Sequence, residues 1–363
     1  MKTQQNLLIG SHHALLNLER VLLTAKASVT PRGAILLGDS IACDAYHKNR
    51  PLRVVTHAHA DHTGGLRWSL RDCEKVLMTK ATKDLIDVLE GPFNSKMKSI
   101  ETLDYEKPLQ YNDESITLFR AEHILGAAQV LVENSNGDRV GWTGDFKIDG
   151  TPILDCDTLV IESTYGNPSC KRSFDVDVRE LLVQMVEARL KNGPVYIFGY
   201  HGKLQEIMQI LHKAHVSVPF VMPEKVHQIS KVCENHGMEL GCMTLSTQKE
   251  GKMLLDENLP CVAFYHMNSR NRVGLLDERI CISGWEFRSP CRRIGEREYV
   301  LALSDHSDFD GLIEYVRRAR PKQVITDNHA AGGNGEILAK EIKKRLKIPA
   351  IAMPSLISQS ILS

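Results

Sequence analysis

Several features that would assign the chain to a compartment or a structural class are missing from the sequence. The nine cysteines are scattered singly, and no two of them form a C-x-x-C pair. This spacing argues against a disulfide framework and against a cysteine zinc knuckle, and it favours reduced thiols in a cytoplasmic protein. No run reaches the roughly 18 apolar residues that a membrane-spanning helix needs. Residues 1–20 lack an apolar core followed by a small-residue cleavage site, so we expect no secretory signal.

The sequence also lacks net charge, internal repeats and recognisable linkers. Its 45 Lys and Arg residues balance 45 Asp and Glu residues, which argues against a protein that coats nucleic acid by bulk charge. A local basic patch is still allowed. No tract rich in Pro, Gly or Ser divides the chain. Its 363 residues, 42% of them hydrophobic, correspond to two domains or to one large domain with an insertion.

Short apolar runs rich in Val, Ile and Thr predict a series of strands in the first half of the chain. They cover 33–38, 52–56, 75–79, 115–119, 129–133, 139–144 and 157–163. From about residue 176, a helical pattern that stops at Gly193 is followed by alternating strand-like and helix-like stretches. This alternation predicts a small α/β layer with a parallel sheet. A helix at 311–319, a strand at 322–326 and a helix at 334–346 follow, so the alternating block is predicted to be inserted into the first domain.

The segment VVTHAHADHTGGL, at 54–66, holds the chemistry that is most specific in the sequence. In its H-x-H-x-D-H pattern, His57 and His59 point the same way if the backbone is extended, because side chains alternate along a strand. Asp61 and His62 follow at a turn that ends in two glycines. Imidazoles and a carboxylate suit zinc or another divalent metal. A solvated polar loop is the alternative, but the full pattern directly after an apolar strand favours a metal site.

Three more strand ends carry candidate residues for the same site. His123 lies at a strand end before a glycine, and Asp145 follows a strand and a glycine. Asp39, in LLGDS, follows another strand and is a candidate to orient a ligating imidazole from behind. Each of these would be a weak signal alone, because single His and Asp residues usually lie at the surface.

The ordered series of Asp39, the 57–62 cluster, His123 and Asp145 spans about 110 residues and resembles the metallo-β-lactamase superfamily. The resemblance implies an α/β fold, an αββα sandwich with a dinuclear metal site at one edge. It implies that one metal is held by His57, His59 and His123, that the second is held by Asp61 and His62, and that Asp145 bridges them. Two neighbouring metals can generate a hydroxide nucleophile at neutral pH and polarise the group under attack, which also gives Asp61 a catalytic role.

The second half of the chain resembles the β-CASP nucleases of that superfamily. LVIESTYGNP, at 159–168, is similar to their acidic motif and places Glu162 in it; ALSDHSDFDGL, at 302–312, is similar to their next motif and places His306 in it. SGWEFRSPCRR, at 283–293, is most similar to bacterial DNA-ligase-associated exonucleases. We therefore expect a metallo-β-lactamase domain at 1–193 and 301–363, with a smaller α/β β-CASP domain inserted at 194–300.

The expected chemistry follows from these two motifs. Cleavage of a phosphodiester needs a stabilised negative charge and a protonated leaving oxygen. His306 can protonate that oxygen while Glu162 holds its imidazole in one tautomer. A surface carboxylate and a residue beside a helix cap are the ordinary readings of these two positions, but they leave the order of the motifs unexplained.

One motif departs from the family pattern. β-CASP RNases end the last core strand with Val-His-Gly, whose histidine completes the second metal site, whereas this chain has QVITDNHAAGG. Strict register puts Asn328 at that position, and a shifted turn would deliver His329, which we favour as the ligand. Artemis-related DNA nucleases also replace this histidine, so the departure favours DNA slightly. The altered segment AFYHMNSRNR, at 263–272, leaves the substrate groove undefined.

Basic residues of the insert are candidates for contacts with phosphates. They are Lys203, Arg288, Arg292 and Arg293, with Arg297 nearby. A solvated loop and a phosphate-contact patch are equally compatible with this run.

The sequence therefore predicts a metal-dependent nuclease with two divalent ions, zinc being favoured and manganese the alternative. We expect an exonuclease acting on single strands or ends, with DNA slightly ahead of RNA as substrate. The alternatives are a ribonuclease that processes RNA 3′ ends, an acyl hydrolase that cleaves thioesters or lactones, and an inactive scaffold subunit. Nucleic acid is the expected partner, no membrane association is expected, and the oligomeric state is left open, a homodimer included.

Overall fold

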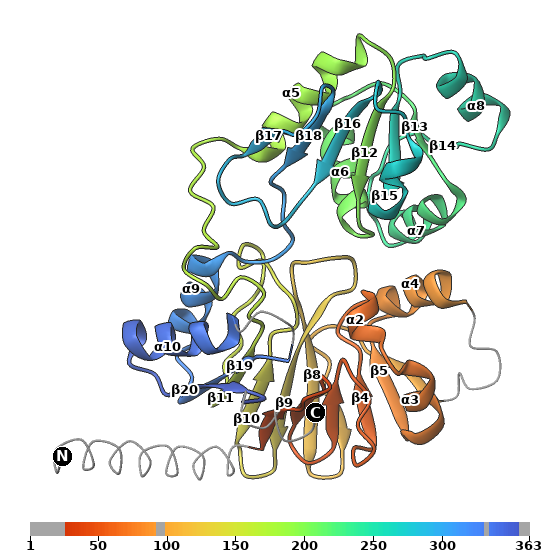
Figure 1. Cartoon of the computed structure of the whole chain (residues 1–363). Coiled ribbons are helices and arrows are strands. Elements are labelled where there is room, and N and C mark those ends of the chain that lie inside the picture. The colour runs from red at the N-terminus through yellow and green to blue at the C-terminus, as the bar shows by residue number, and fades with distance from the viewer. Residues whose placement is uncertain (1–25, 92–98, 330–333, 356–363) are drawn as a thin grey trace.

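The computed structural model describes residues 26–91, 99–329 and 334–355. Its elements form two halves, with a pair of sheets in the lower half and a third sheet in the upper half (Figure 1). Helices lie along the outer sides of the paired sheets and around the third sheet (Figure 1). The molecule is therefore a mixed α/β protein, as the alternating apolar patterns predict.

The first sheet has six strands in the order β1-β2-β3-β4-β5-β6. β1, β2 and β3 pair antiparallel, and β3 to β6 pair parallel. The carboxyl ends of the parallel strands lie on the same side of the sheet, and the histidine-rich segment at 54–66 begins there, at the end of β4. The bounds are β1 Ala27–Val29, β2 Ile35–Leu37, β3 Ile41–Cys43, β4 Leu52–Val54, β5 Lys75–Met78 and β6 Ile100–Thr102; the helices between them are α2 Ala60–Thr63, α3 Leu66–Asp72 and α4 Lys80–Glu90.

The second sheet has seven strands in the order β20-β19-β11-β10-β9-β8-β7. Its strands are β7 Leu109–Tyr111, β8 Glu114–Arg120, β9 Ala128–Asn134, β10 Arg139–Trp142, β11 Thr158–Ile161, β19 Gln323–Asp327 and β20 Ala350–Met353, with α9 Phe309–Ala319 and α10 Asn334–Leu346 before and after β19. β11 and β19 are neighbours and pair parallel, with Thr158 opposite Gln323. The chain therefore leaves this sheet after β11 and returns beside the same strand.

The two sheets share one core. Buried residues of the first sheet, such as Leu37 and Val54, belong to the same cluster as Ile116, Val130 and Trp142 of the second. β8 shows the alternation expected of a strand with one buried face, since Ile116 and Leu118 are buried and Thr117 between them is partly exposed. This packing holds the loops at the strand ends in fixed positions.

The third sheet is built entirely from residues between β11 and β19. Its order is β14-β13-β15-β12-β16-β18-β17, and every neighbouring pair is parallel except β17 and β18. The central strands read as continuous apolar runs because helices cover both faces of a parallel sheet. The bounds are α5 Val178–Leu190, β12 Val195–Gly199, α6 Lys203–Lys213, β13 Phe220–Met222, α7 Glu224–Asn235, β14 Met243–Leu245, α8 Lys249–Asp256, β15 Val262–His266, the 3₁₀ helix η2 Met267–Arg272, β16 Glu278–Ile282, β17 Cys291–Arg293 and β18 Glu298–Leu301.

Contacts between α4 and α7 join the two halves. His236 Nε2 lies 2.9 Å from Asp84 Oδ2, and Lys225 Nζ donates to the carbonyl of Val88 at 2.7 Å. Leu85 of α4 belongs to the same buried cluster as the apolar residues of α6 and α7. No helix among the described residues is long and apolar enough to cross a membrane. All nine cysteines are free thiols.

Candidate active site

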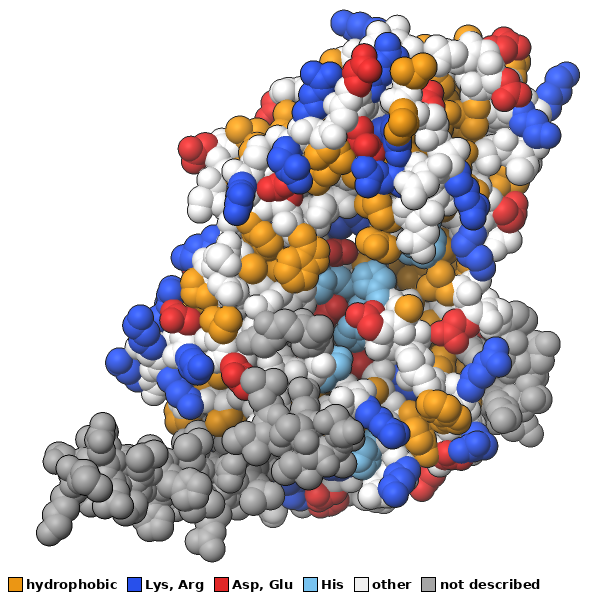
Figure 2. Space-filling view, viewed as in Figure 1, with side chains coloured by type: hydrophobic (Ala, Val, Ile, Leu, Met, Phe, Trp, Pro, Cys, Tyr) orange, Lys and Arg blue, Asp and Glu red, His pale blue; other side chains and the backbone are white. Residues whose placement is uncertain are grey.

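The candidate site lies in the hollow between the two halves, where histidine side chains gather (Figure 2). The loop after β4 brings His57 and His59, the loop after β8 brings His123, and the loop after β10 brings Asp145. Glu162 follows β11, and His306 follows β18. The site is therefore assembled from strand ends of all three sheets.

Three imidazoles converge on one point. His59 Nδ1 lies 3.1 Å from both His57 Nε2 and His123 Nε2. Nitrogens bound tetrahedrally at about 2.0–2.1 Å from a zinc ion lie about 3.3 Å apart. These three nitrogens therefore have the spacing of ligands to a single ion.

In each of the three rings, the nitrogen that faces away from the other two histidines has a hydrogen-bond partner elsewhere, so the inner nitrogen is left to bind a metal. His57 Nδ1 lies 3.1 Å from Thr56 Oγ1, His59 Nε2 lies 3.2 Å from the carbonyl of His201, and His123 Nδ1 lies 2.9 Å from the carbonyl of Asp305. Carbonyls only accept, so the hydrogens of His59 and His123 lie on these outer nitrogens. Thr56 Oγ1 donates to Asp44 Oδ1 and therefore accepts from His57. The three inner lone pairs point at one another, as a metal requires.

Burial keeps two of these rings, those of His57 and His123, neutral. Burial is the largest cause of both shifts: the pKa of His57 lies well below its ordinary value, and the pKa of His123 is lowered to about 3. Neutral imidazole is the form that binds a metal. The donor set thus fits a divalent ion both in geometry and in protonation.

A second group of ligand atoms lies beside the first and centres on Asp145. Its Oδ2 lies 3.3 Å from His62 Nε2 and 3.7 Å from His57 Nε2. Asp61, an exposed residue, has its Oδ2 3.7 Å from His62 Nε2. Burial raises the pKa of Asp145, but the surrounding imidazoles, above all His62, outweigh it and hold the pKa well below its usual range. The structure therefore brings His62, Asp61 and Asp145 together beside the three-histidine group.

The carboxylate behind His62 is Asp44, not Asp39. Asp44 Oδ2 lies 3.1 Å from His62 Nδ1 and accepts from Trp142 Nε1 at 2.8 Å, and Asp44 Oδ1 accepts from the Thr56 amide. Asp39 is exposed at the β2–β3 turn, where it pairs with Lys26 at 2.5 Å. The expectation for Asp39 is wrong. Asp39 lies in the turn before β3, and because β3 runs parallel to β4, this turn is at the opposite end of the strands from the residues that follow β4. Asp44 follows β3, whose parallel pairing with β4 brings it to the metal-site edge.

Glu162, which is buried, pairs with His306, which is partly buried, next to Asp145. His306 Nδ1 lies 3.0 Å from Glu162 Oε1, and His306 Nε2 lies 3.9 Å from Asp145 Oδ2. Amides of Phe146 and Thr164 donate to the same carboxylate. Burial lowers the pKa of His306, but the carboxylates of Glu162 and Asp145 outweigh this effect and raise the pKa to about 10.

The basic candidates separate into two environments. Lys203 is buried at the start of α6, where Nζ pairs with Glu206 and lies 3.9 Å from Asp305 Oδ2. Lys203 is therefore not part of an exposed patch, because these carboxylates neutralise it in the interior. Arg288, Arg292 and Arg293 are exposed, and Arg292 Nε pairs with Glu286 Oε2 at 3.0 Å.

Both candidate side chains that follow β19 make contacts outside the three-histidine group. Asn328 is buried, and its amide donates to the carbonyl of Pro354 at 3.2 Å. His329 Nδ1 lies 2.7 Å from Asp327 Oδ1, and its ring packs against Gly33, so that a Cβ there would lie 2.7 Å from His329 Nε2. Neither residue belongs to the potential metal-binding groups found in the described part of the chain. Residues 330–333, which follow, are outside the described residues.

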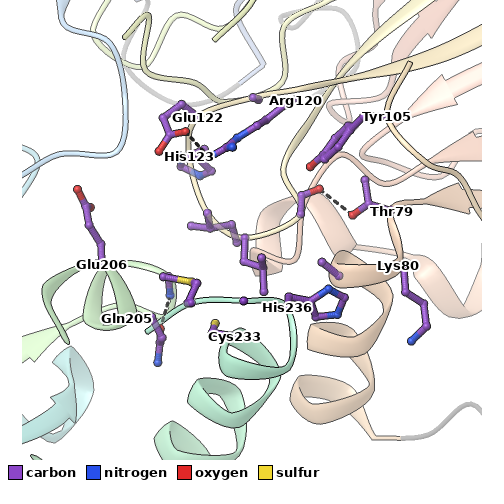
Figure 3. Close-up of a pocket in the computed structure, with 18 of the residues that line it drawn as sticks. Thr79, Lys80, Tyr105, Arg120, Glu122, His123, Gln205, Glu206, Cys233 and His236 are labelled. Carbon is purple, nitrogen blue, oxygen red and sulfur yellow. Dashed lines mark hydrogen bonds and ion pairs between the residues drawn. The ribbon is translucent and has the colours of Figure 1, made fainter. Parts of the chain in front are cut away.

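A cleft of about 530 Å³ reaches His123 from the side of α4 and α7. Figure 3 shows Tyr105, Arg120 and Glu122 from the lower half and Gln205, Glu206 and His236 from the upper half around it. Both charge signs are present, so the lining indicates a polar, solvated cleft between the halves.

Sequence reasoning missed several residues that shape this site. They are Asp44, whose signal was a carboxylate at the end of β3, and His201 and Asp305, which act through backbone carbonyls and leave no signal in side-chain type. Tyr165 was also missed, although it lies in the quoted segment at 159–168; its ring centroid lies 5.7 Å from that of His306.

Comparison with known proteins gives a consistent set of relatives. An uncharacterized protein in the lig 3′ region of Acidianus ambivalens is 42% identical over 138 residues, which cover 38% of this chain and 99% of that protein. A probable DNA ligase from Opitutus terrae is 25% identical over 285 residues, which cover 75% of this chain and 26% of the ligase. Probable RNase MJ4 from Methanocaldococcus jannaschii is 27% identical over 219 residues, which cover 50% of each chain. The chain thus spans half or less of the last two relatives.

A solved structure shares the fold. The crystal structure of a protein of unknown function from Enterococcus faecalis V583 superposes with a TM-score of 0.56 at 15% identity and covers 85% of this chain and 81% of that one. No protein-family model matches the chain.

Proposed function

Because the chain belongs to the β-CASP group of the metallo-β-lactamase superfamily, we propose that it is a metal-dependent nuclease that hydrolyses phosphodiester bonds. The relatives include a protein named RNase and a protein named DNA ligase, which supports nucleic acid as the substrate class. In this proposal the paired sheets form the αββα core, and the third sheet is the inserted β-CASP domain. Because α5 packs on β12, we place the first boundary of the proposed insert before Val178, although the sequence led us to expect it at 193.

The metal-binding residues of the proposal are those that the hollow brings together. His57, His59 and His123 would hold one divalent ion, His62 and Asp61 a second, and Asp145 lies between the two groups with its Oδ2 3.3–3.9 Å from four imidazole nitrogens. His329 is proposed to complete the second group through Nε2, because Asp327 occupies its Nδ1. Bound ions would supply an activated water and neutralise phosphate charge, which suits zinc first and manganese second.

The Glu162–His306 pair is the observation that best supports hydrolysis of a phosphodiester bond. Glu162 occupies Nδ1 of His306, so the Nε2 hydrogen faces Asp145 and the metal-binding groups. The raised pKa keeps His306 protonated at neutral pH, and a protonated imidazole can donate to the leaving oxygen of a phosphodiester. Hydrolysis of a thioester or lactone does not need this partly buried acid, which argues against an acyl hydrolase. The near-complete set of candidate ligands argues against an inactive scaffold.

The finer substrate choice is DNA, as single strands or ends, degraded exonucleolytically. Its support is the match to a ligase and to a protein in a lig 3′ region. The relative named RNase favours RNA instead, so RNA processing is the second candidate. The nine free thiols support the cytoplasm as the proposed compartment.

End-labelled DNA and RNA oligonucleotides, incubated with chelated protein and with protein given zinc or manganese, test the proposal. We expect metal-dependent shortening of the labelled strand, stronger for DNA, and close to two metal equivalents per chain by elemental analysis. A protein that cleaves neither nucleic acid but hydrolyses a thioester would contradict the proposal. Metal content of one equivalent or less would contradict the dinuclear site.

A further inference from the structure

An exposed tryptophan lies next to the candidate acid. Trp285 is 63% exposed, whereas Trp142, in the core, is 1% exposed. The Trp285 ring centroid lies 5.0 Å from that of Tyr165, and the Tyr165 centroid lies 5.7 Å from that of His306. One buried ring therefore separates an open indole from the residue that would protonate the leaving group.

The Trp285 segment is held in place by several contacts. The Trp285 amide donates to Ser283 Oγ at 3.1 Å. Arg172 places its guanidinium carbon 4.7 Å from the centroids of both Tyr165 and Phe287 and donates to the carbonyl of Gly284. A Cβ on Gly284 would lie 2.3 Å from the hydroxyl of Tyr165, so the loop approaches that ring as closely as glycine allows. The indole is thus a preorganised surface, since its supporting rings are already packed.

A second exposed ring lies on the neighbouring strand. Trp285 follows β16 and Tyr200 follows β12, and these strands pair parallel with Phe198 opposite Cys281. Tyr200 is 57% exposed, and the carbonyl of the next residue, His201, accepts from the metal-site His59. Two exposed aromatic side chains therefore follow the carboxyl ends of neighbouring parallel strands in the third sheet.

Burying an aromatic ring is favourable, so a folded chain leaves an indole open beside a polar site only at a cost in free energy. Proteins that bind single strands use exposed aromatic side chains along the binding groove as platforms on which bases stack. We infer that Trp285 stacks on a nucleobase of the bound single strand and sets the position of the scissile phosphate beside His306. This inference rests on the proposed nuclease function and names Trp285 as a positioning residue. Tyr200 offers a stacking surface for a different base.

The test uses single-stranded phosphorothioate oligonucleotides, each with one abasic nucleotide at a successive position, and the metal-loaded protein. In wild type, one position should require its base, and removing that base should weaken binding by about 5- to 150-fold, the range for a base stacked on an aromatic ring. Trp285→Ala should bind the intact strand more weakly by a similar factor and lose the sensitivity at that position only. Trp285→Phe should recover part of the affinity, and Tyr200→Ala should lose sensitivity at another position.

Trp68→Ala is the matched control, because Trp68, on helix α3, is 57% exposed and contacts Tyr46. It should bind every oligonucleotide as wild type does. This variant keeps two of the three tryptophans, the core residue Trp142 and the exposed Trp285, so the fluorescence of Trp285 should be quenched when the intact strand binds.

The outcomes separate the inference from the proposed function. If wild type cleaves and binds DNA while Trp285→Ala keeps the same sensitivity at every position, the stacking role is wrong and the nuclease stands. If Trp285→Ala weakens all oligonucleotides equally and changes the hydrodynamic size, the ring mediates contact between copies and the inference is also wrong. If wild type neither binds nor cleaves, the proposed function fails and takes the inference with it.

Discussion

At the residue scale, the orientation of each imidazole depends on a neighbour that never touches a metal. Thr56, the carbonyl of His201 and the carbonyl of Asp305 each occupy one ring nitrogen of a histidine. Asp44 does the same for His62. Such partners fix both the tautomer and the ring orientation, so they belong to the site as much as the ligands do.

Asp44→Asn should lower the affinity for metal by about 10- to 100-fold, because the amide loses the negative charge that makes His62 a better ligand. Competition with a coloured chelator measures this affinity. Asp39→Asn is the matched control, since Asp39 is an exposed carboxylate five residues earlier, and it should bind metal as wild type does. Equal affinities in the two variants would refute the role of Asp44.

His306→Ala should reduce turnover by about 10²- to 10⁴-fold while metal content stays unchanged, because a general acid is lost and no ligand is removed. A nitrophenyl phosphodiester should be affected much less, since its leaving oxygen is stable as an anion. Steady-state rates on both substrates and elemental analysis check this. Equal losses on both substrates would leave His306 as a phosphate anchor rather than an acid.

At the element scale, the site depends on where strands end and how helices of the upper half meet loops of the lower half. The N-terminus of α6 packs against the loop that carries His123. Gly202, which precedes α6, has a φ of +85°, and a Cβ there would lie 2.2 Å from Ile124 Cγ2. The contact between the halves thus requires a residue without a side chain at this position.

Gly202→Ala should destabilise the protein and displace the His123 loop. The positive φ alone should cost about 1–2 kcal/mol, and the clash with Ile124 should add about 1–3 kcal/mol. Gly237→Ala separates the two effects, because Gly237 has a φ of +89° with nothing within 4 Å of a Cβ. Urea unfolding should show a larger loss for Gly202→Ala, and its metal content should fall while that of Gly237→Ala does not.

At the scale of the whole molecule, the proposed function would require a chain of zero net charge to attract nucleic acid through a local surface. Arg292 and Arg293 are exposed on β17, at the edge of the third sheet. Glu286 pairs with Arg292 and offsets its charge, so Arg293 carries more of the positive charge of this surface.

Arg292→Ala combined with Arg293→Ala should weaken binding of single strands and flatten the dependence of log K on log salt by up to about 1.4, since each neutralised phosphate contributes about 0.7. Lys343→Ala combined with Lys344→Ala removes the same charge from α10 and should change neither quantity. Fluorescence anisotropy titrations over a range of salt concentrations compare the variants. Unchanged slopes in the arginine variant would make this surface an ordinary solvated face.

Much of the fold could be predicted from local pattern. The runs at 52–56, 115–119, 129–133 and 157–163 are strands β4, β8, β9 and β11, because β-branched apolar runs between turn signals fit buried strands wherever they pair. The helices at 311–319 and 334–346 are α9 and α10. β1, β3 and β17 were not predicted, because their residues, ASV, IAC and CRR, do not lie in a longer apolar run, whereas the equally short β4 does.

The sequence by itself determined the part of the candidate metal site whose residues are close together along the chain. His57, His59, Asp61 and His62 share one strand end, so their proximity needs no knowledge of the fold. Tertiary structure alone decided between Asp44 and Asp39, buried Lys203, turned Asn328 into the interior and set Trp285 beside Tyr165. These outcomes depend on which strands are neighbours and on contacts such as His306 with Glu162, 144 residues apart. Contacts between residues so far apart in the sequence are set by the packing of whole sheets, and the local hydrophobic pattern of the sequence does not predict them.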